Sequence, residues 1–126
     1  MLYQLRDRSH RVVTGVALLR SKSSRLELER CESTVRMQRY TAAAVERYLA
    51  SGSPLDKAGA YGIQDAGHAL VDRKAFVDCL ANVMGLPLCH LARAARRLGW
   101  EAPEDVPSAC QRHLGYECPV HKEILN

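Results

Sequence analysis

The sequence predicts an α/β fold, a mixed β-sheet flanked by helices. The run from Arg11 to Arg20 is continuous, apolar and rich in β-branched residues, which is typical of a strand. The next stretch, from Arg25 to Met37, alternates apolar and charged residues, as a half-buried strand does. Two later segments, residues 41–51 and 87–98, carry apolar residues at helical spacing. Strands and helices therefore interleave along the chain.

The two strands are expected to pair as a hairpin across the turn-like Ser21–Ser24. Because its apolar residues are continuous, Arg11–Arg20 is predicted to be buried on both faces. In the second strand Leu26 and Leu28 point one way, and the intervening glutamates point the other way. Further along, the apolar residues occupy odd positions, so we expect a bulge or bend near Cys31–Ser33.

The first long helix is predicted to begin after Thr41, whose side chain can cap it. Its expected apolar face is Val45, Tyr48 and Leu49, and the glycine and proline at positions 52 and 54 end it. A short strand is expected at Ala69–Asp72. Residues 80–87, LANVMGLP, are typical of a turn with small residues.

The last predicted helix has Pro87 in its first turn and Gly99 at its end. Its shared face is expected to carry Leu88, Leu91, Ala95 and Leu98, with Arg93, Arg96 and Arg97 mostly outside that face. Residues 1–100 are predicted to form one domain. Residues 101–126 are predicted to form a Pro-containing Cys/His tail on the surface.

Composition points to a cytoplasmic protein with an anionic ligand. Eighteen Lys and Arg against fourteen Asp and Glu give a net charge of +4, and the basic residues are scattered, which favours a phosphate-bearing ligand over nucleic acid. Five cysteines without an export signal indicate reduced thiols. No apolar run approaches the roughly 20 residues of a membrane span, so no membrane partner is expected.

The stretch Asp56–Gln64, DKAGAYGIQ, is the first candidate site. Gly59 and Gly62 permit positive φ and close backbone approach, so exposed N–H groups could line an anion. Lys57 supplies a matching charge, and the Gln64 amide can both donate and accept, as reading the edge of a base requires. The alternative is a tight surface turn with a solvated lysine, because the run lacks a fixed phosphate-loop signature.

The tail contains a second candidate, CQRHLGYECPVH. Two Cys/His pairs at the same spacing are ligands that Zn²⁺ accepts, which makes a candidate zinc set of Cys110, His113, Cys118 and His121. Only four residues separate the pairs, so one ion could be enclosed only by a tight knuckle. The alternative is a surface tail without metal. The acids Asp56, Asp65, Asp72 and Asp78 are interpreted as solvated or capping carboxylates.

Several stretches in one order resemble the Maf family of nucleoside triphosphate pyrophosphatases. They are TGVAL at 14–18, STVRM at 33–37, ERYLASGSPLDKAGAYGIQ at 46–64 and ANVMGLPLCHL at 81–91. The resemblance extends to about Gly99 and implies a Maf/ITPase-like fold. The form D-K-A-G-A-Y-x-I-Q resembles the branch that acts on dTTP and UTP.

The resemblance implies a hydrolase of nucleotide metabolism that converts dTTP or UTP to the monophosphate and pyrophosphate, with Mg²⁺ or Mn²⁺ as cofactor. It implies that Gln64 is the substrate-specificity residue and that Lys57 lies near the anionic part of the nucleotide. Gly59 and Gly62 would keep the loop thin. Members of the family often pair as homodimers, so a homodimer is a possible assembly.

The Ser-x-Arg-Arg and Ala-Asp-Thr motifs of the family do not occur in this sequence. The chain is therefore expected to be a truncated form, the C-terminal portion of the family domain without its N-terminal part. Its catalytic residues stay unassigned, and whether it is an enzyme by itself is left open. The alternative is a non-catalytic nucleotide-binding or dimerising module left by loss of the N-terminal half.

Overall fold

A computed structural model describes residues 1–65, 67–68 and 70–126. The contacts between these residues divide the chain into two units. Unit 1 comprises Met1–Arg11 and Thr34–Phe76, and unit 2 comprises Val12–Ser33 and Val77–Asn126. Two of the boundaries between the units, after Arg11 and after Ser33, fall within the two β-strands. Each unit therefore includes part of the same β-hairpin.

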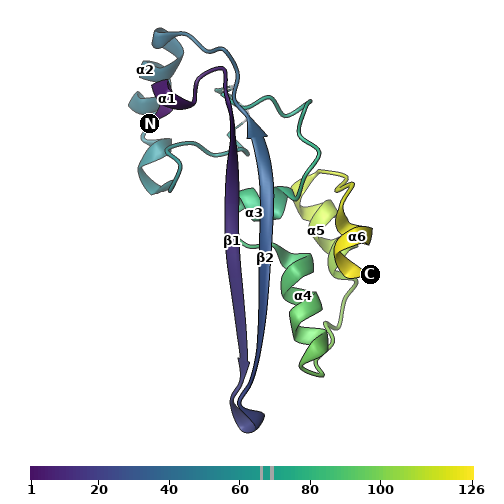
Figure 1. The fold of residues 1–126 in the computed structure, drawn as a ribbon. Helices are drawn as coiled ribbons and strands as arrows, with labels where there is room; N and C mark the ends of the chain where they lie inside the picture. Colours follow the sequence, from purple (N-terminus) through teal and green to yellow (C-terminus); the bar gives the residue numbers. More distant parts are fainter. Residues whose placement is uncertain (66, 69) are drawn as a thin grey trace. The chain divides into compact units, whose positions relative to one another are not determined.

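The hairpin consists of β1 (Ser9–Arg20) and β2 (Arg25–Arg36), joined by the 3₁₀ turn η1 (Ser21–Ser23). Ser24 closes the turn with φ 51°. The predicted strands, turn and hairpin are confirmed, and helices follow them along the chain (Figure 1). The predicted mixed sheet is not found, because the described residues form a sheet of two strands that a short connection makes antiparallel.

Burial of β1 on both faces is wrong. Exposed and half-buried residues alternate along the strand, and Val13 and Leu19 are 50% and 67% exposed. Within unit 2 the helices lie on one side of the hairpin, so alternate residues of a two-stranded ladder are left on the other side (Figure 1). A continuous apolar run therefore did not indicate a covered strand here.

The change of phase from which a bulge or bend near Cys31–Ser33 was predicted is not found, because one alternation of buried and exposed residues runs through β2 from Glu27 to Val35. Odd-numbered residues of β2 face inward along its length, including Glu29, which is 9% exposed. Leu26 and Leu28 lie outside at 55% and 65% exposed. The inner face can include Glu29 because arginine side chains donate hydrogen bonds to its carboxylate, which compensates for the cost of burying the charge.

Unit 1 contains α1 (Leu2–Leu5), α2 (Ala42–Ala50) and the 3₁₀ turn η2 (Ser53–Asp56). The predicted cap of α2 is confirmed, since Thr41 Oγ1 accepts from the Ala44 N–H at 3.2 Å. Val45 and Tyr48 are buried as predicted, whereas Leu49 is exposed. No described segment covers Leu49, so the buried face of α2 is narrower than its apolar pattern.

The strand expected at Ala69–Asp72 is reduced to an isolated antiparallel bridge between Met37 and Val71. The Gln38 N–H donates to the Leu70 carbonyl at 2.8 Å beside this bridge. Ala69 lies outside the described residues. The few hydrogen bonds hold the loop after position 56 against the end of β2 within unit 1.

Unit 2 contains α3 (Leu80–Met84), α4 (Leu88–Arg97), α5 (Val106–Leu114) and α6 (His121–Leu125). Helix α4 packs against α5 and α6, and α3 packs against α5 (Figure 1). The turn expected at residues 80–87 is thus partly helical, and Gly85, with φ 123°, ends α3. Residues 101–126 lie at the surface as predicted, since Ile124 is the one buried residue among them, but they form two helices, α5 and α6, that pack against α4.

The buried side of α4 differs from the predicted face. Ala95 and Leu98 are buried as expected, but Leu88 and Leu91 are only half-buried. Cys89, His90 and Ala94 are buried in addition. Arg93 is not outside the packed side, because its guanidinium turns inward to the Glu29 carboxylate.

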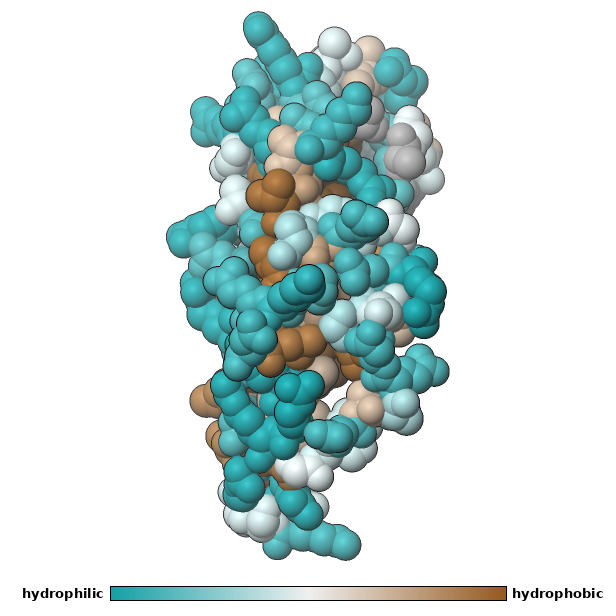
Figure 2. All heavy atoms as spheres, turned by 90° about the vertical axis from the view of Figure 1, so that its right-hand side faces the viewer, coloured by the Kyte–Doolittle hydropathy of each residue, from teal (hydrophilic) through white to brown (hydrophobic). Residues whose placement is uncertain are grey.

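Among the residues described, none of the helices combines the length and the apolar character that a membrane crossing needs. Figure 2 shows hydrophilic residues at the lower end of the view, which is the end where Figure 1 places the turn of the hairpin. That turn carries Lys22 and is fully exposed.

Candidate functional site

The stretch Asp56–Gln64 lies in unit 1, where it follows η2 as a pair of tight turns. The Ala60 N–H donates to the Lys57 carbonyl at 3.0 Å, and the Asp65 N–H donates to the Gly62 carbonyl at 3.1 Å. Pro54 is the second residue of η2 and is buried, which anchors the segment that leads into the loop. The structure therefore brings all the predicted substrate-binding residues into one loop.

The glycines serve a different purpose from the predicted one. The residue with left-handed backbone is Ala60, with φ 58°, whereas neither Gly59 nor Gly62 has positive φ. A Cβ at Gly62 would lie 2.7 Å from Asp65 Oδ2, and one at Gly59 would lie 3.2 Å from the Tyr61 ring. A side chain at Gly62 would force Asp65 to move, whereas one at Gly59 would need the Tyr61 ring to shift by only a few tenths of an ångström.

Asp65 is the acceptor that holds the loop together. Its Oδ2 accepts hydrogen bonds from the Tyr48 hydroxyl at 2.6 Å and the Ser53 hydroxyl at 2.8 Å. The Tyr48 oxygen in turn accepts from the Gly62 N–H at 2.9 Å. Burial raises the pKa of Asp65, but the hydrogen bonds from Tyr48 and Ser53 outweigh it and the pKa is lowered.

Sequence reasoning did not find this support. Asp65 was interpreted as a solvated or capping carboxylate, and Tyr48 as one residue of an apolar helix face. The structure makes both of them parts of one network, with Tyr48 fully buried. The sequence feature that could have indicated this network is the tyrosine on the apolar face of the helix, because a buried hydroxyl needs a hydrogen-bond partner.

The two polar ends of the loop differ in their partners. Lys57 Nζ lies 2.5 Å from Asp56 Oδ1 and 3.4 Å from the Ser53 carbonyl. The hydrogen bond to Asp56 raises the pKa of Lys57, so this ammonium stays charged. The Gln64 side chain is exposed. An ammonium and an amide are thus both available on one short loop.

Tyr61 of the loop forms a pair with His10 of β1. The Tyr61 hydroxyl lies 2.9 Å from His10 Nε2, and the two rings meet edge to face at 5.5 Å. Burial raises the pKa of Tyr61 to about 12 and lowers the pKa of His10. The phenol and the imidazole are both neutral at pH 7, so this pair braces the loop without adding charge.

The structure does not assemble the candidate zinc set. Cys110, Cys118 and His121 line one small pocket of unit 2, whereas His113 lines a larger pocket that, of these residues, only Cys110 shares. In the part of the chain that the structure describes, no group of three or more His, Cys, Asp or Glu is arranged to hold a metal ion.

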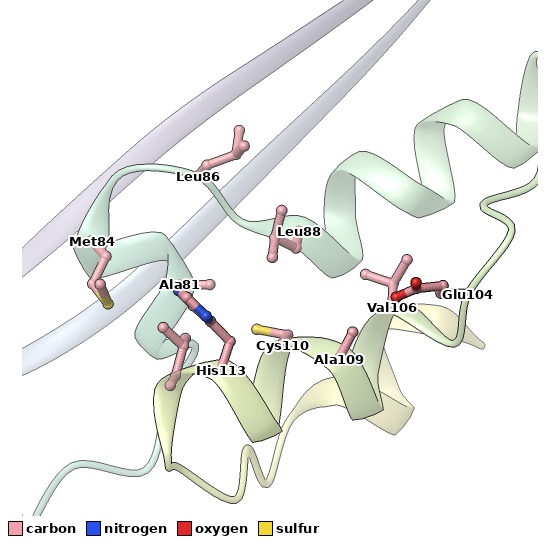
Figure 3. A pocket seen from close by; sticks show the side chains of 10 residues that line it. Ala81, Met84, Leu86, Leu88, Glu104, Val106, Ala109, Cys110 and His113 are labelled. Carbon is pink, nitrogen blue, oxygen red and sulfur yellow. The ribbon is translucent and has the colours of Figure 1, made fainter.

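The large pocket of unit 2 has a volume of about 510 Å³ and was not anticipated from the sequence. Figure 3 shows its wall, in which Cys110 and His113 of α5 face side chains from α3 and the start of α4. Glu104 and His113 are polar, and the remaining lining is apolar or sulfur-bearing: Ala81, Met84, Leu86, Leu88, Val106, Ala109, Cys110 and Leu114. Such a lining suits an apolar ligand rather than a triphosphate.

Comparisons with known proteins agree on one family. The family model described as Maf-like protein matches residues 1–98. A dTTP/UTP pyrophosphatase of Dehalococcoides mccartyi is 38% identical over 99 residues, which are 79% of this chain and 43% of that protein. A dTTP/UTP pyrophosphatase of Halalkalibacterium halodurans is 46% identical over 100 residues, 79% of this chain and 50% of that protein.

A third relative, the dTTP/UTP pyrophosphatase of Anaeromyxobacter sp. (strain Fw109-5), is 42% identical over 110 residues, 85% of this chain and 53% of that protein. The chain spans about half the length of the curated relatives it matches. The match of the family model includes the whole of Asp56–Gln64.

Proposed function

Because the chain belongs to the Maf-like family, we propose that it provides the nucleotide-recognition part of a nucleoside triphosphate pyrophosphatase that acts on dTTP or UTP. The reaction would yield the monophosphate and pyrophosphate. Gln64 would contact the base, and Lys57 would contact the phosphates. The names of the relatives support the substrate class, and the loop chemistry supports the roles of the two residues.

The observation that carries this proposal is a braced loop with polar ends. Asp65, Tyr48 and Ser53 hold the loop by hydrogen bonds from behind, while Gln64 stays exposed. A braced loop loses little conformational freedom when a ligand binds, so more of the contact free energy appears as affinity. An exposed amide with one donor group and one acceptor can read the two adjacent polar atoms of a pyrimidine edge.

Lys57 is able to exchange its present partner for a phosphate. Its carboxylate partner, Asp56, has a side chain that is 79% exposed, so their ion pair is in contact with solvent. Ion pairs in contact with solvent contribute little to stability, because water and salt screen them. A polyphosphate can therefore displace Asp56 with little loss of free energy. The several oxygens of the polyphosphate also offer the Lys57 ammonium stronger hydrogen bonds.

A divalent cation, Mg²⁺ or Mn²⁺, stays a prediction from the family resemblance. When bound it would supply charge neutralisation at the phosphates. The carboxylates beside the loop do not fit such an ion by themselves, because Asp65 accepts from Tyr48 and Ser53 and Asp56 pairs with Lys57. We therefore assign these residues no step that involves the metal. A homodimer and a cytoplasmic location also stay predictions.

The proposal is tested first by binding. Isothermal titration of the purified chain with UTP, dTTP, CTP and 7-methyl-GTP should show preference for the first two nucleotides. Gln64→Ala should weaken UTP binding by about tenfold, the loss expected for one hydrogen-bonding group, and should reduce the preference over CTP. Lys57→Ala should weaken all triphosphates alike. The controls are Gln4→Ala and Lys22→Ala, which remove an exposed amide and an exposed ammonium outside the loop.

Pyrophosphate release with Mg²⁺ or Mn²⁺ then separates the enzyme from the binding module. Turnover of dTTP or UTP that is lost in Gln64→Ala would mean that this chain completes a working site. Binding without turnover would favour the non-catalytic module. Absence of binding to every nucleotide, in a chain shown to be folded by circular dichroism, would contradict the proposal.

A further inference from the structure

All five cysteines of the chain belong to unit 2, and all are free. They come from separate segments: β2, the residue before α3, α4, α5 and the turn between α5 and α6. Cys79, Cys89, Cys110 and Cys118 line one small apolar pocket together with His121. Cys31 and Cys79 share a buried cluster against which Cys110 packs. Packing alone does not require several cysteines in one core, since other small apolar residues fill the same space.

Two of these thiols lie together. Cys79 and Cys118 both line this small pocket, and each side chain perturbs the pKa of the other. The backbone holds them there, because the Tyr116 hydroxyl donates to the carbonyl of Asp78, next to Cys79, at 3.0 Å. The Cys118 N–H donates to Gln111 Oε1 at 2.9 Å, which fixes the turn after α5. The contact therefore joins two ordered segments that are far apart in the sequence.

The two thiols differ in exposure and acidity. Cys79 is 5% exposed, whereas Cys118 is only half-buried. The hydrogen bond with Cys79 and the backbone N–H groups of Val120 and His121 lower the pKa of Cys118. The same hydrogen bond, together with burial, raises the pKa of Cys79. Because Cys118 is the more exposed of the two sulfurs, it is the one that a peroxide meets first.

We propose that Cys79 and Cys118 are a redox-sensitive pair that closes to a disulfide when the protein meets a peroxide. This modification lies in unit 2 and is separate from the loop Asp56–Gln64, which lies in unit 1. It does not depend on the nucleotide function proposed above.

The chemistry needs one peroxide and two thiols. The Cys118 thiolate attacks hydrogen peroxide, the O–O bond breaks, and an S–O bond forms, so that the sulfur is oxidised to a sulfenic acid and the departing hydroxide takes a proton to become water. Cys79 then attacks the Cys118 sulfur, the S–O bond breaks, and hydroxide leaves with the Cys79 proton as a second water. The products are one disulfide and two waters.

Cys31 is the competing partner, because its thiol also hydrogen-bonds to Cys79. Its exposure is only 3%, and burial raises its pKa, so it meets peroxide slowly and as a thiol. The first bond to form is therefore between Cys118 and Cys79. That bond would tie the turn between α5 and α6 covalently to the start of α3.

The test is oxidation of the full reduced chain with stoichiometric hydrogen peroxide, followed by blocking of free thiols and non-reducing peptide mapping by mass spectrometry. The expected product is a monomer lighter by two hydrogens, with the Cys79 and Cys118 peptides crosslinked, and dithiothreitol should reverse it. Cys79→Ser and Cys118→Ser should abolish this crosslink. Cys110→Ser is the matched control, because Cys110 lines the same pocket, and it should form the crosslink at the wild-type rate. A Cys31–Cys79 crosslink, an intermolecular disulfide or a sulfinic acid as main product would overturn the proposal.

A second measurement needs no variant and so avoids any folding defect. Brief treatment of the reduced native chain with iodoacetamide should label Cys118 at least about tenfold faster than Cys31 or Cys89, since a partly exposed thiolate reacts before a buried thiol. Equal labelling of the three cysteines would show that Cys118 is not the reactive member, and the proposal would fail.

Discussion

Gly62 is the residue of the loop at which a side chain has no room. A Cβ there would lie 2.7 Å from Asp65 Oδ2, and the carboxylate cannot move away without losing its bonds to Tyr48 and Ser53. We predict that Gly62→Ala lowers the free energy of unfolding by about 1–3 kcal/mol, as overpacking does. Urea unfolding at pH 7 measures this change.

The control for that substitution is Gly15→Ala in β1, where no atom lies within 4 Å of the new Cβ. It should change the free energy of unfolding by less than about 0.5 kcal/mol, as surface substitutions usually do. Equal destabilisation by both substitutions would refute the steric argument for Gly62.

The Tyr48 hydroxyl is the other residue-scale support of the loop. It donates to Asp65 and accepts from the Gly62 N–H, and Tyr48 itself is fully buried. Tyr48→Phe would leave both partners with one bond fewer, so we predict a loss of about 1–3 kcal/mol in the free energy of unfolding.

Tyr3→Phe is a suitable comparison for Tyr48→Phe, because the Tyr3 hydroxyl donates to Glu46 at the exposed surface. Thermal and urea unfolding of this variant should match the wild type within about 0.5 kcal/mol. If Tyr48→Phe were equally neutral, water would be replacing the hydroxyl and the loop would not depend on it.

At the scale of elements, Glu29 joins β2 to α4 within unit 2. Its carboxylate lies between Arg93 and Arg97, with Arg93 Nη2 2.5 Å from Oε2 and Arg97 Nη1 3.1 Å from Oε1. The hydrogen bonds from Arg93 lower the pKa of Glu29 below its usual 4.5. The free energy of unfolding therefore depends on pH through the ion pair between Glu29 and Arg93.

The direction follows from proton linkage. A lowered folded pKa contributes stability that is present above pH 4.5, the ordinary value, and is lost as the pH falls through the folded pKa. We predict that Glu29→Gln costs about 1–3 kcal/mol at pH 7 and that this cost decreases as the pH falls below 4.5 towards 2. Urea unfolding of both proteins across this pH range measures the difference.

Glu32→Gln is the comparison for Glu29→Gln, because Glu32 pairs with the exposed Arg30 on the same strand. Its effect should stay within about 1 kcal/mol at pH 7, the range of surface ion pairs. A cost for Glu29→Gln that persisted unchanged at pH 2–3 would mean that the loss comes from packing and not from the ion pair.

The same element explains why the register of β2 was not foreseen. Alternation by itself gives two faces, and the apolar one is normally taken as the inner face. Here the arginines of α4 satisfy Glu29, and Leu26 and Leu28 are left outside. The partners come from more than 60 residues further along the chain, as the separation of 64 between Glu29 and Arg93 shows, so no local pattern reveals them.

At the scale of the whole molecule, the net charge of +4 favours anionic ligands through a field that salt screens. If the proposed nucleotide binding is right, raising NaCl from about 50 to about 300 mM should weaken UTP binding by about threefold to tenfold. Uridine, which has no phosphate, should bind with no such dependence. Isothermal titration of both ligands measures this, and equal salt dependence would show that the phosphates are not the groups attracted.

The sequence alone determined the hairpin, the capped helix α2, the extent of α4 and the family. These depend on signals within a few residues, such as strand alternation, the Thr41 cap and Pro87, or on ordered motifs such as DKAGAYGIQ. The candidate loop was found in the same way. Its polar ends, Lys57 and Gln64, can be read directly from the sequence.

Only the tertiary structure decided how those elements are supported. It placed Tyr48 and Ser53 on Asp65, turned Glu29 inward to Arg93, and packed the helices α5 and α6 of the surface tail against α4. It also brought Cys79 against Cys118. Each of these contacts joins segments separated by at least a turn or an element, and its free energy arises from burial and pairing that no local pattern encodes.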